Sequence, residues 1–183
     1  MSEIIPKPIN DFWNPIINGE TFMDFQNYCE KEEKLSADDI EIIKENAKMI
    51  IQRCIEPQSV STYNRTNLHI GDVQSGKTLT MAAAIALAHD NNFLLTTLLT
   101  GTKTILKAQN ESRIESILQW IDKDRDKFYF YKADDSQLKT QVKQLDRELR
   151  SGGYKTMIVS IILKETKHIN DLTNKFQKLD LTK

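Results

Sequence analysis

The sequence contains few cysteines, and this scarcity excludes two classes of protein. Only Cys29 and Cys54 are present among 183 residues. They form no C-x-x-C pair, and no histidine stands at metal-ligand spacing from them. A disulfide-stapled scaffold and a cysteine-based zinc site are therefore excluded. We expect two reduced thiols in helices and a cytoplasmic protein.

Long hydrophobic runs are also missing. The longest apolar stretches, such as MIVSIIL at 157–163, fall far short of the roughly 18 residues that a membrane span requires. The first residues, MSEIIPKPIND, lack the basic-then-apolar layout of a secretory signal. We therefore expect no membrane partner.

An excess of charge of either sign is absent as well. The 25 Lys and Arg residues stand against 26 Asp and Glu residues, which gives a formal net charge of −1. This balance excludes binding to nucleic acid by bulk positive charge alone, although it allows a local basic groove. The remaining composition, 39% hydrophobic and 28% charged, is typical of a globular domain with one sizeable core.

The apolar pattern divides the chain into a helical region, residues 1–60, and an α/β region, residues 61–183. In the first region, Ser-Ala-Asp-Asp at 36–39 is a capping box that predicts the start of an amphipathic helix. The apolar face of this helix is expected to comprise Ile40, Ile43, Ala47, Ile50, Ile51 and Cys54. The early aromatic residues are expected to pack this helical appendage onto the sheet: Phe12, Trp13, Phe22, Phe25 and Tyr28.

The second region alternates strands with helices. Strands are predicted at 66–70, 93–99, 128–131 and 156–162. Helices are predicted at 77–89, 102–120, 138–149 and 166–176. This order implies parallel strands joined by right-handed crossovers, and hence a three-layer α/β sheet.

The segment GDVQSGKT at 71–78 has the G-x-x-x-x-G-K-T spacing of a phosphate-binding loop. Gly71 and Gly76 can adopt backbone angles closed to other residues, so that amide N–H groups surround phosphate oxygens at the positive end of the next helix. Lys77 would reach the β and γ phosphates, and the Thr78 hydroxyl would bind Mg²⁺. The predicted site for ATP and Mg²⁺ comprises Gly71, Val73, Gln74, Ser75, Gly76, Lys77 and Thr78.

Two features argue against hydrolysis by these residues alone. Asp72 places a carboxylate beside the phosphate cradle, so a degenerate, weakly binding loop is an alternative. A P-loop hydrolase also needs an apolar strand that ends in Asp or Asp-Glu, whereas the strand at 156–162 leads into a lysine. Gln177 occupies the acidic position of the guanine-recognition motif, which disfavours a GTPase. We expect the acidic strand beyond residue 183, in a longer protein, and hydrolysis by this segment stays an open question.

The loop, with Val-Gln before Ser-Gly-Lys-Thr, resembles that of the Z-one domain, a helicase-like ATPase family related to superfamily-two helicases. Three further segments are similar to the family: AKMIIQRCIEPQ at 47–58, LLTGTKTILKAQNESRI at 98–114 and TMIVSIILKETKHINDL at 156–172. The resemblance implies a partial RecA-like P-loop NTPase domain, the amino-terminal part of an ATP-dependent DNA motor of a kind often linked to restriction or anti-phage systems. It also implies nucleic-acid backbone contacts by Thr100, Gly101, Gln109 and Arg113.

Other interpretations fit the same residues. Gln109 and Arg113 lie one helical turn apart, which is more typical of a solvated helix face than of a nucleic-acid contact. The aromatic run at 128–131 would stack bases, but its β propensity favours an ordinary strand. The alternative function is a regulatory module in which the loop holds nucleotide or phosphate and the helical region binds a protein. A small-molecule phosphotransferase would need an acceptor pocket and lid arginines, and neither is visible.

Overall fold

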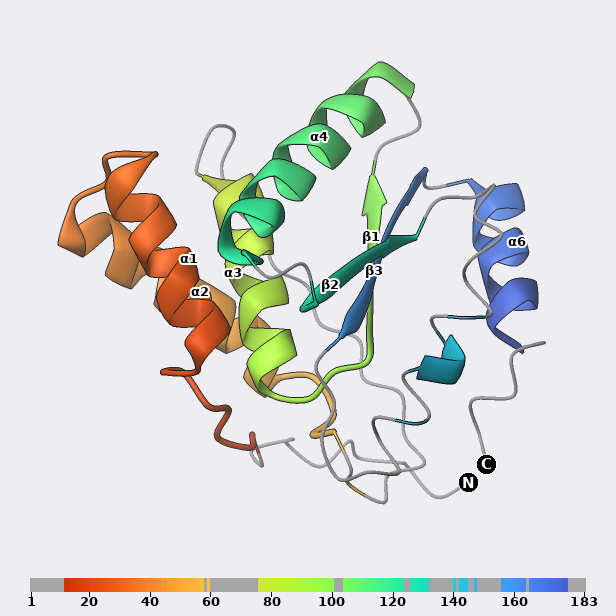
Figure 1. The fold of residues 1–183 in the computed structure, drawn as a ribbon, viewed down its shortest axis with the longest axis horizontal. Helices are drawn as coiled ribbons and strands as arrows, with labels where there is room; N and C mark the ends of the chain where they lie inside the picture. The colour runs from red at the N-terminus through yellow and green to blue at the C-terminus, as the bar shows by residue number, and fades with distance from the viewer. Residues whose placement is uncertain are drawn as a thin grey trace, which may run out of the picture.

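The structure is a computed structural model. It describes helices before the predicted loop, the end of that loop, and helices and strands after it. The described residues are 12–57, 59, 76–100, 104–123, 126–131, 140, 142–144, 147, 156–163 and 165–177. The helices are α1 (Glu20–Lys31), α2 (Ala37–Gln52), α3 (Lys77–Asp90), α4 (Thr104–Ile121) and α6 (Thr166–Gln177). The strands are β1 (Leu95–Thr100), β2 (Phe128–Tyr131) and β3 (Met157–Leu163) (Figure 1). The predicted strand at 66–70 and most of the predicted helix at 138–149 lie outside these residues.

The three strands form one parallel sheet in the order β1-β3-β2, with β3 in the middle. Leu95 pairs with Ile158 at one end of the β1–β3 ladder, and Thr100 pairs with Leu163 at the other. The β2–β3 ladder begins where Phe128 pairs with Met157. The expected α/β class with a parallel sheet is thereby confirmed. None of the described helices combines the length and the apolar character needed to cross a membrane.

Helices cover both faces of this sheet. Successive side chains of a strand point to opposite faces, so Met157 and Val159 enter the core shared with α3 and α4, while Ile158 enters a second cluster. Leu172 of α6 packs against that second cluster. Figure 1 shows α6 on the side of the sheet opposite α3 and α4. Burial on both faces explains why β3 reads as a continuous apolar run rather than an alternating one.

Helix α3 is buried around nearly its whole circumference. Its buried residues are Leu79, Thr80, Ala82, Ala83, Ile85, Ala86, Leu87 and Ala88. Helices α1, α2 and α4 all pack against it, and Figure 1 shows α1 and α2 on the side away from the sheet. A helix that is hydrophobic all round is stable only in an interior, and here α1 and α2 complete that interior. The helical region therefore shares one continuous hydrophobic core with β2 and β3.

The capping box at the start of α2 is confirmed. The Ser36 hydroxyl accepts a hydrogen bond from the Asp39 N–H at 3.2 Å, and the Asp39 carboxylate accepts one from the Ser36 N–H at 3.4 Å. The predicted apolar face is buried except at its carboxyl end, where Ile50 and Cys54 are only half-buried. The helix ends at Gln52, so Cys54 lies beyond the helix rather than within its apolar stripe.

Four of the five early aromatic residues pack into the core. The prediction that they pack onto the sheet is wrong for α1, which packs against helices. Phe22 and Phe25 are fully buried, and their ring centroids lie 5.8 Å apart. Trp13 and Tyr28 pack partly buried against the same core, and Tyr28 contacts a tryptophan of α4. Phe12 contradicts the expectation, because it is 44% exposed. Helix α1 packs against α3 and α4, which separate these rings from the sheet.

Both cysteines are free thiols, as the composition predicted. Burial, followed by the nearby Glu33 and Glu30 carboxylates, raises the pKa of Cys29 to about 12. A thiol with so high a pKa stays protonated at neutral pH and is a poor nucleophile. Cys29 is therefore a small apolar core residue of α1.

Candidate functional site

The structure describes the last three residues of the predicted nucleotide loop. Gly76 immediately precedes α3, and Lys77 and Thr78 form its first two positions. Gly71, Val73, Gln74 and Ser75, together with Asp72, lie outside the described residues. The predicted helix after the loop is confirmed, with an end one residue later than expected.

Gly76 is needed for its backbone conformation. It is the N-cap of α3 and has φ 72° and ψ 19°, in the left-handed region that disfavours residues with a Cβ atom. Among the described residues, no atom lies within 4 Å of the position that a Cβ would occupy, so the constraint found there is the backbone conformation. The second glycine of the G-x-x-x-x-G-K-T pattern thus has a geometric reason in this fold.

The first turn of α3 has the electrostatic character of an anion site. It contains no acidic residue, and its N-cap, Gly76, has no side chain that could cap it. The first hydrogen bond across the turn runs from the Thr80 N–H to the Gly76 carbonyl at 3.0 Å, so the N–H groups of Lys77, Thr78 and Leu79 precede the helical ladder. These N–H groups carry the positive end of the helix dipole. The Lys77 side chain is exposed at the same end of the helix, and Thr78 is half-buried.

This turn lies on the side of the sheet where parallel α/β proteins bind ligands. Helix α3 and strand β1 run in opposite directions (Figure 1), so Gly76 lies towards the carboxyl ends of the strands. Open α/β sheets bind ligands at that edge.

Glu165, shortly after β3, has its carboxylate 3.6 Å from the His168 ring. The described part of the chain contains no group of three or more His, Cys, Asp or Glu that could hold a metal ion. Thr78, the residue predicted to bind Mg²⁺, lies within the described residues.

The four predicted nucleic-acid contacts are divided between β1 and α4. Thr100 is the last residue of β1, at the carboxyl edge, and Gly101 lies outside the described residues. Gln109 and Arg113 are exposed on α4. The Arg113 guanidinium lies 3.7 Å from the Glu33 carboxylate, near the end of α1, which partly neutralises it.

That ion pair belongs to a row of polar contacts between α1 and the α4–β2 segment. The Tyr28 hydroxyl donates to Glu33 at 2.8 Å, and the Trp120 indole N–H donates to Glu32 at 3.2 Å. Burial, followed by the Glu33 contact, raises the pKa of Tyr28 to about 12. These contacts fix α1 against α4 and explain the side-chain positions without a ligand.

Lys127, just before β2, extends the row. Its ammonium group contacts both Glu20 and Asp24 of α1 at 3.1 Å. Burial alone would lower the pKa of Lys127, but these two carboxylates raise it above its usual value. The aromatic run that follows forms β2, with Phe128 and Tyr131 buried, so the strand interpretation is confirmed.

The carboxyl end of α3 makes a junction that the sequence analysis missed. The Asp90 carboxylate accepts hydrogen bonds from the Thr21 N–H at 3.0 Å and the Phe22 N–H at 2.8 Å, in the first turn of α1. The Asn91 side chain accepts from the Ile16 N–H at 2.7 Å and donates to the Ile16 carbonyl at 2.8 Å. A ring nitrogen of His89 lies 2.8 Å from the Thr21 hydroxyl. We call this set of contacts the α3–α1 junction.

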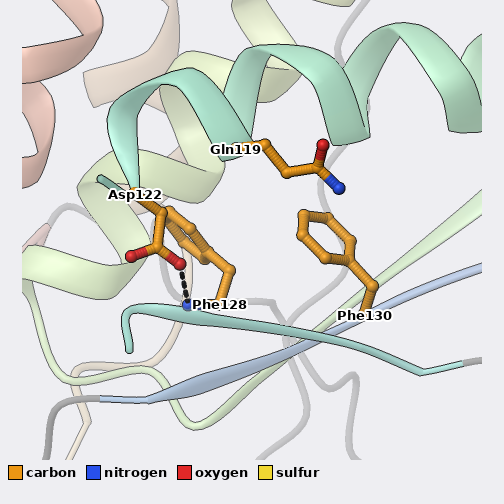
Figure 2. A pocket seen from close by; sticks show the side chains of 4 residues that line it. All are labelled: Gln119, Asp122, Phe128 and Phe130. Carbon is orange, nitrogen blue, oxygen red and sulfur yellow. Dashed lines mark hydrogen bonds between the residues drawn. The ribbon is translucent and has the colours of Figure 1, made fainter. Parts of the chain in front are cut away.

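A pocket of about 200 Å³ lies between α4 and β2. Figure 2 shows the four residues that line it: Gln119, Asp122, Phe128 and Phe130. The buried Asp122 carboxylate is already engaged, because it accepts hydrogen bonds from the N–H groups of Asp126, Lys127 and Phe128 at 3.1 Å. Ligand pockets usually enclose about 300–1,000 Å³. The pocket is therefore too small, and its carboxylate too fully bonded, to rank as the ligand site.

Replacing Gly76 with alanine is expected to lower the free energy of unfolding by about 1–2 kcal/mol, because a Cβ is disfavoured in the left-handed region. Asparagine tolerates this conformation better, so Gly76→Asn should cost less than Gly76→Ala. Urea denaturation of the two variants and the parent chain measures both effects. Equal stability of all three proteins would show that the residue does not hold this conformation.

In comparisons with known proteins, no protein-family model, no curated protein and no solved structure matches the chain.

Proposed function

We propose that the chain binds ATP with Mg²⁺ through the loop GDVQSGKT at the start of α3. The observation that carries the proposal is the conformation of Gly76. The second glycine of the motif is left-handed at the N-cap, and the exposed Lys77 follows it at once. A phosphate-binding loop requires a glycine, a lysine and a helix start in this order.

The charge distribution supports a polyphosphate as the ligand. The first turn of α3 offers N–H groups and one ammonium group, and none of its residues is acidic. Negative charge placed there is stabilised by the helix dipole and by Lys77. When Mg²⁺ accompanies the nucleotide, the Thr78 hydroxyl would hold the ion, which offsets the negative charge of the phosphates.

Within this proposal, the chain is the ATP-binding part of a cytoplasmic, helicase-like ATPase that acts on DNA, of a kind linked to restriction or anti-phage systems. The support is the resemblance of GDVQSGKT and its flanking segments to the Z-one domain, together with a parallel sheet of compatible class. A three-layer RecA-like P-loop domain is the fold that this proposal requires. Two of the proposed nucleic-acid contacts, Gln109 and Arg113, are exposed, and Arg113 also pairs with Glu33.

A second candidate is a nucleotide- or phosphate-binding regulatory module that does not hydrolyse its ligand. It is favoured by the carboxyl end of β3, where Leu163 is followed by Lys164 instead of the acid that a P-loop hydrolase uses. Both candidates share the phosphate site and differ in turnover. Phosphate release from ATP, measured with and without DNA, separates a hydrolase from a binding module.

Calorimetric titration with three ligands tests the shared phosphate site. Mg²⁺-bound ATP and inorganic tripolyphosphate should both bind, because the N–H groups and Lys77 contact phosphate oxygens. Adenosine should bind at least about 100-fold more weakly than ATP, since it lacks the charged groups that the site stabilises. Equal binding of adenosine and ATP, or no binding of either phosphate ligand, would refute the proposal.

A further inference from the structure

We propose that α3 couples the phosphate site at its first turn to the docking of α1 at its last turn. A bound phosphate ligand then holds α1 in place. The ligand in this inference is the one assigned under the proposed function. The dependence of the two helices on each other follows from their contacts alone.

The first turn of α1 depends on α3 because its cap comes from that helix. The N-cap of α1 is Gly19, which has no side chain to accept the N–H groups of the first turn. Asp90 supplies both carboxylate oxygens instead, at 3.0 Å from the Thr21 nitrogen and 2.8 Å from the Phe22 nitrogen. A Cβ on residue 19 would overlap the Asp90 carboxyl group, so the glycine allows this close approach. Without Asp90 in place, α1 loses its amino-terminal cap.

The residues beside Asp90 strengthen the same connection. Asn91 is buried, and its side chain pairs with both backbone groups of Ile16 while donating to the Leu87 carbonyl at 2.8 Å. The His89 ring lies 2.8 Å from the Thr21 hydroxyl and 5.3 Å from the centre of the Phe128 ring. Three consecutive residues at the end of α3 therefore hold the segment that leads into α1.

The dependence also runs from α1 to α3. Phe22 and Phe25 of α1 are fully buried in the core that contains the buried side chains of α3. If α1 left, the apolar surface of α3 that it covers would be exposed to water. A helix of 14 residues is marginal on its own and gains its stability from tertiary packing. Loss of α1 should therefore loosen α3, including the turn that carries Gly76 and Lys77.

A phosphate ligand at this turn would distinguish between the two states. It requires the N–H groups of the first turn to point in one direction, and this holds only while α3 is helical. The ligand consequently binds the docked state better than the undocked state, which is the condition for coupling two sites. Occupancy of the phosphate site should then reduce the opening of α1.

Amide hydrogen exchange with and without Mg²⁺-bound ATP tests the coupling. At a ligand concentration 100 times the Kd, exchange of the Thr21 and Phe22 amides should slow by about 100-fold, as should exchange in α3. Lys77→Ala at the same ATP concentration is the matched control, and its exchange should slow by no more than about twofold, because its affinity is expected to be at least about 100-fold weaker. Slower exchange in α3 with unchanged exchange at Thr21 and Phe22 would overturn the inference while leaving the proposed function intact.

Hydrogen exchange measured without any ligand tests separately whether α1 and α3 stabilise each other. Asp90→Asn should speed exchange of the Thr80 and Ala83 amides in α3 by a factor similar to that at Thr21 and Phe22. Faster exchange confined to α1 would show that α1 opens without loosening α3, and would refute this part. If no phosphate ligand binds, the proposed function and the ligand part of the inference both fail, whereas the Asp90→Asn comparison still decides the contact between the helices.

Discussion

Replacing Asp90 with asparagine is expected to lower the free energy of unfolding by about 2–4 kcal/mol, among the largest effects of any single substitution in this chain. The carboxylate is buried and accepts the Thr21 and Phe22 N–H groups. Asparagine keeps one acceptor oxygen but turns an NH₂ group towards the other donor. It also removes the negative charge at the start of α1.

Thermal unfolding followed by circular dichroism measures this effect. The expected loss corresponds to a Tm lower by roughly 5–15 °C for a chain of this size. Asp171→Asn, the same chemical change at an exposed position of α6, should alter stability by no more than about 0.5 kcal/mol. If the two variants unfold at the same temperature, the α3–α1 junction contributes little to the fold.

The same carboxylate gives the stability a defined pH dependence. Burial alone would raise the pKa of Asp90, but hydrogen bonding from His89 and from the Phe22 and Thr21 N–H groups lowers it overall. Of these, the N–H contacts are the firmer, because the nearest His89 nitrogen lies 4.0 Å from the carboxylate. A pKa lowered by folding contributes stability above the usual carboxyl value of about 3.9, and this stability is lost as the pH falls below it. Between about pH 5 and pH 3, the difference in stability between the parent chain and Asp90→Asn should therefore shrink.

Replacing Lys77 with alanine is expected to weaken the binding of Mg²⁺-bound ATP by about 100-fold or more. The substitution removes the ammonium group that the proposal places on the β and γ phosphates. Stability should change by no more than about 0.5 kcal/mol, because the side chain is exposed in the first turn of α3.

Two matched variants make this result specific. Lys77→Arg keeps the positive charge but not the shape of the ammonium group, so it should bind ATP with an affinity between those of the parent and the alanine variant. Lys167→Ala removes an exposed lysine from α6 and should leave the affinity unchanged. Calorimetry with all four proteins measures the series. A similar loss in Lys77→Ala and Lys167→Ala would mean that ATP responds only to the general charge of the protein.

The local parts of the fold could be predicted from the sequence. The capping box at Ser36, the strand at 128–131 and the helix after Gly76 each depend on residues within a few positions of one another. Short-range hydrogen bonds and side-chain periodicity therefore carry enough information to place them. The left-handed Gly76 is the clearest case, because the motif already requires a residue without a Cβ there.

The long-range contacts could not be predicted in this way. Asp90 caps a helix that begins about 70 positions earlier, and His-Asp-Asn at the end of an apolar helix reads as an ordinary helix end. The family resemblance implies a nucleic-acid contact for Arg113, and its ion pair with Glu33, 80 positions away, is not visible in the sequence. The place of β3 between β1 and β2 is likewise a property of chain topology. No local pattern encodes these pairings, since they arise when α1 and α2 complete the core around α3.

The central claim is that the first turn of α3 holds phosphate, and a nuclear magnetic resonance titration of the ¹⁵N-labelled chain tests it most directly. On addition of Mg²⁺-bound ATP, the amide resonances of Lys77, Thr78 and Leu79 should shift in a saturable way, and in Lys77→Ala the Thr78 and Leu79 shifts should require at least about 100-fold more ATP. If ATP shifts resonances elsewhere and leaves these three unchanged, the ligand binds at another place and the account is wrong.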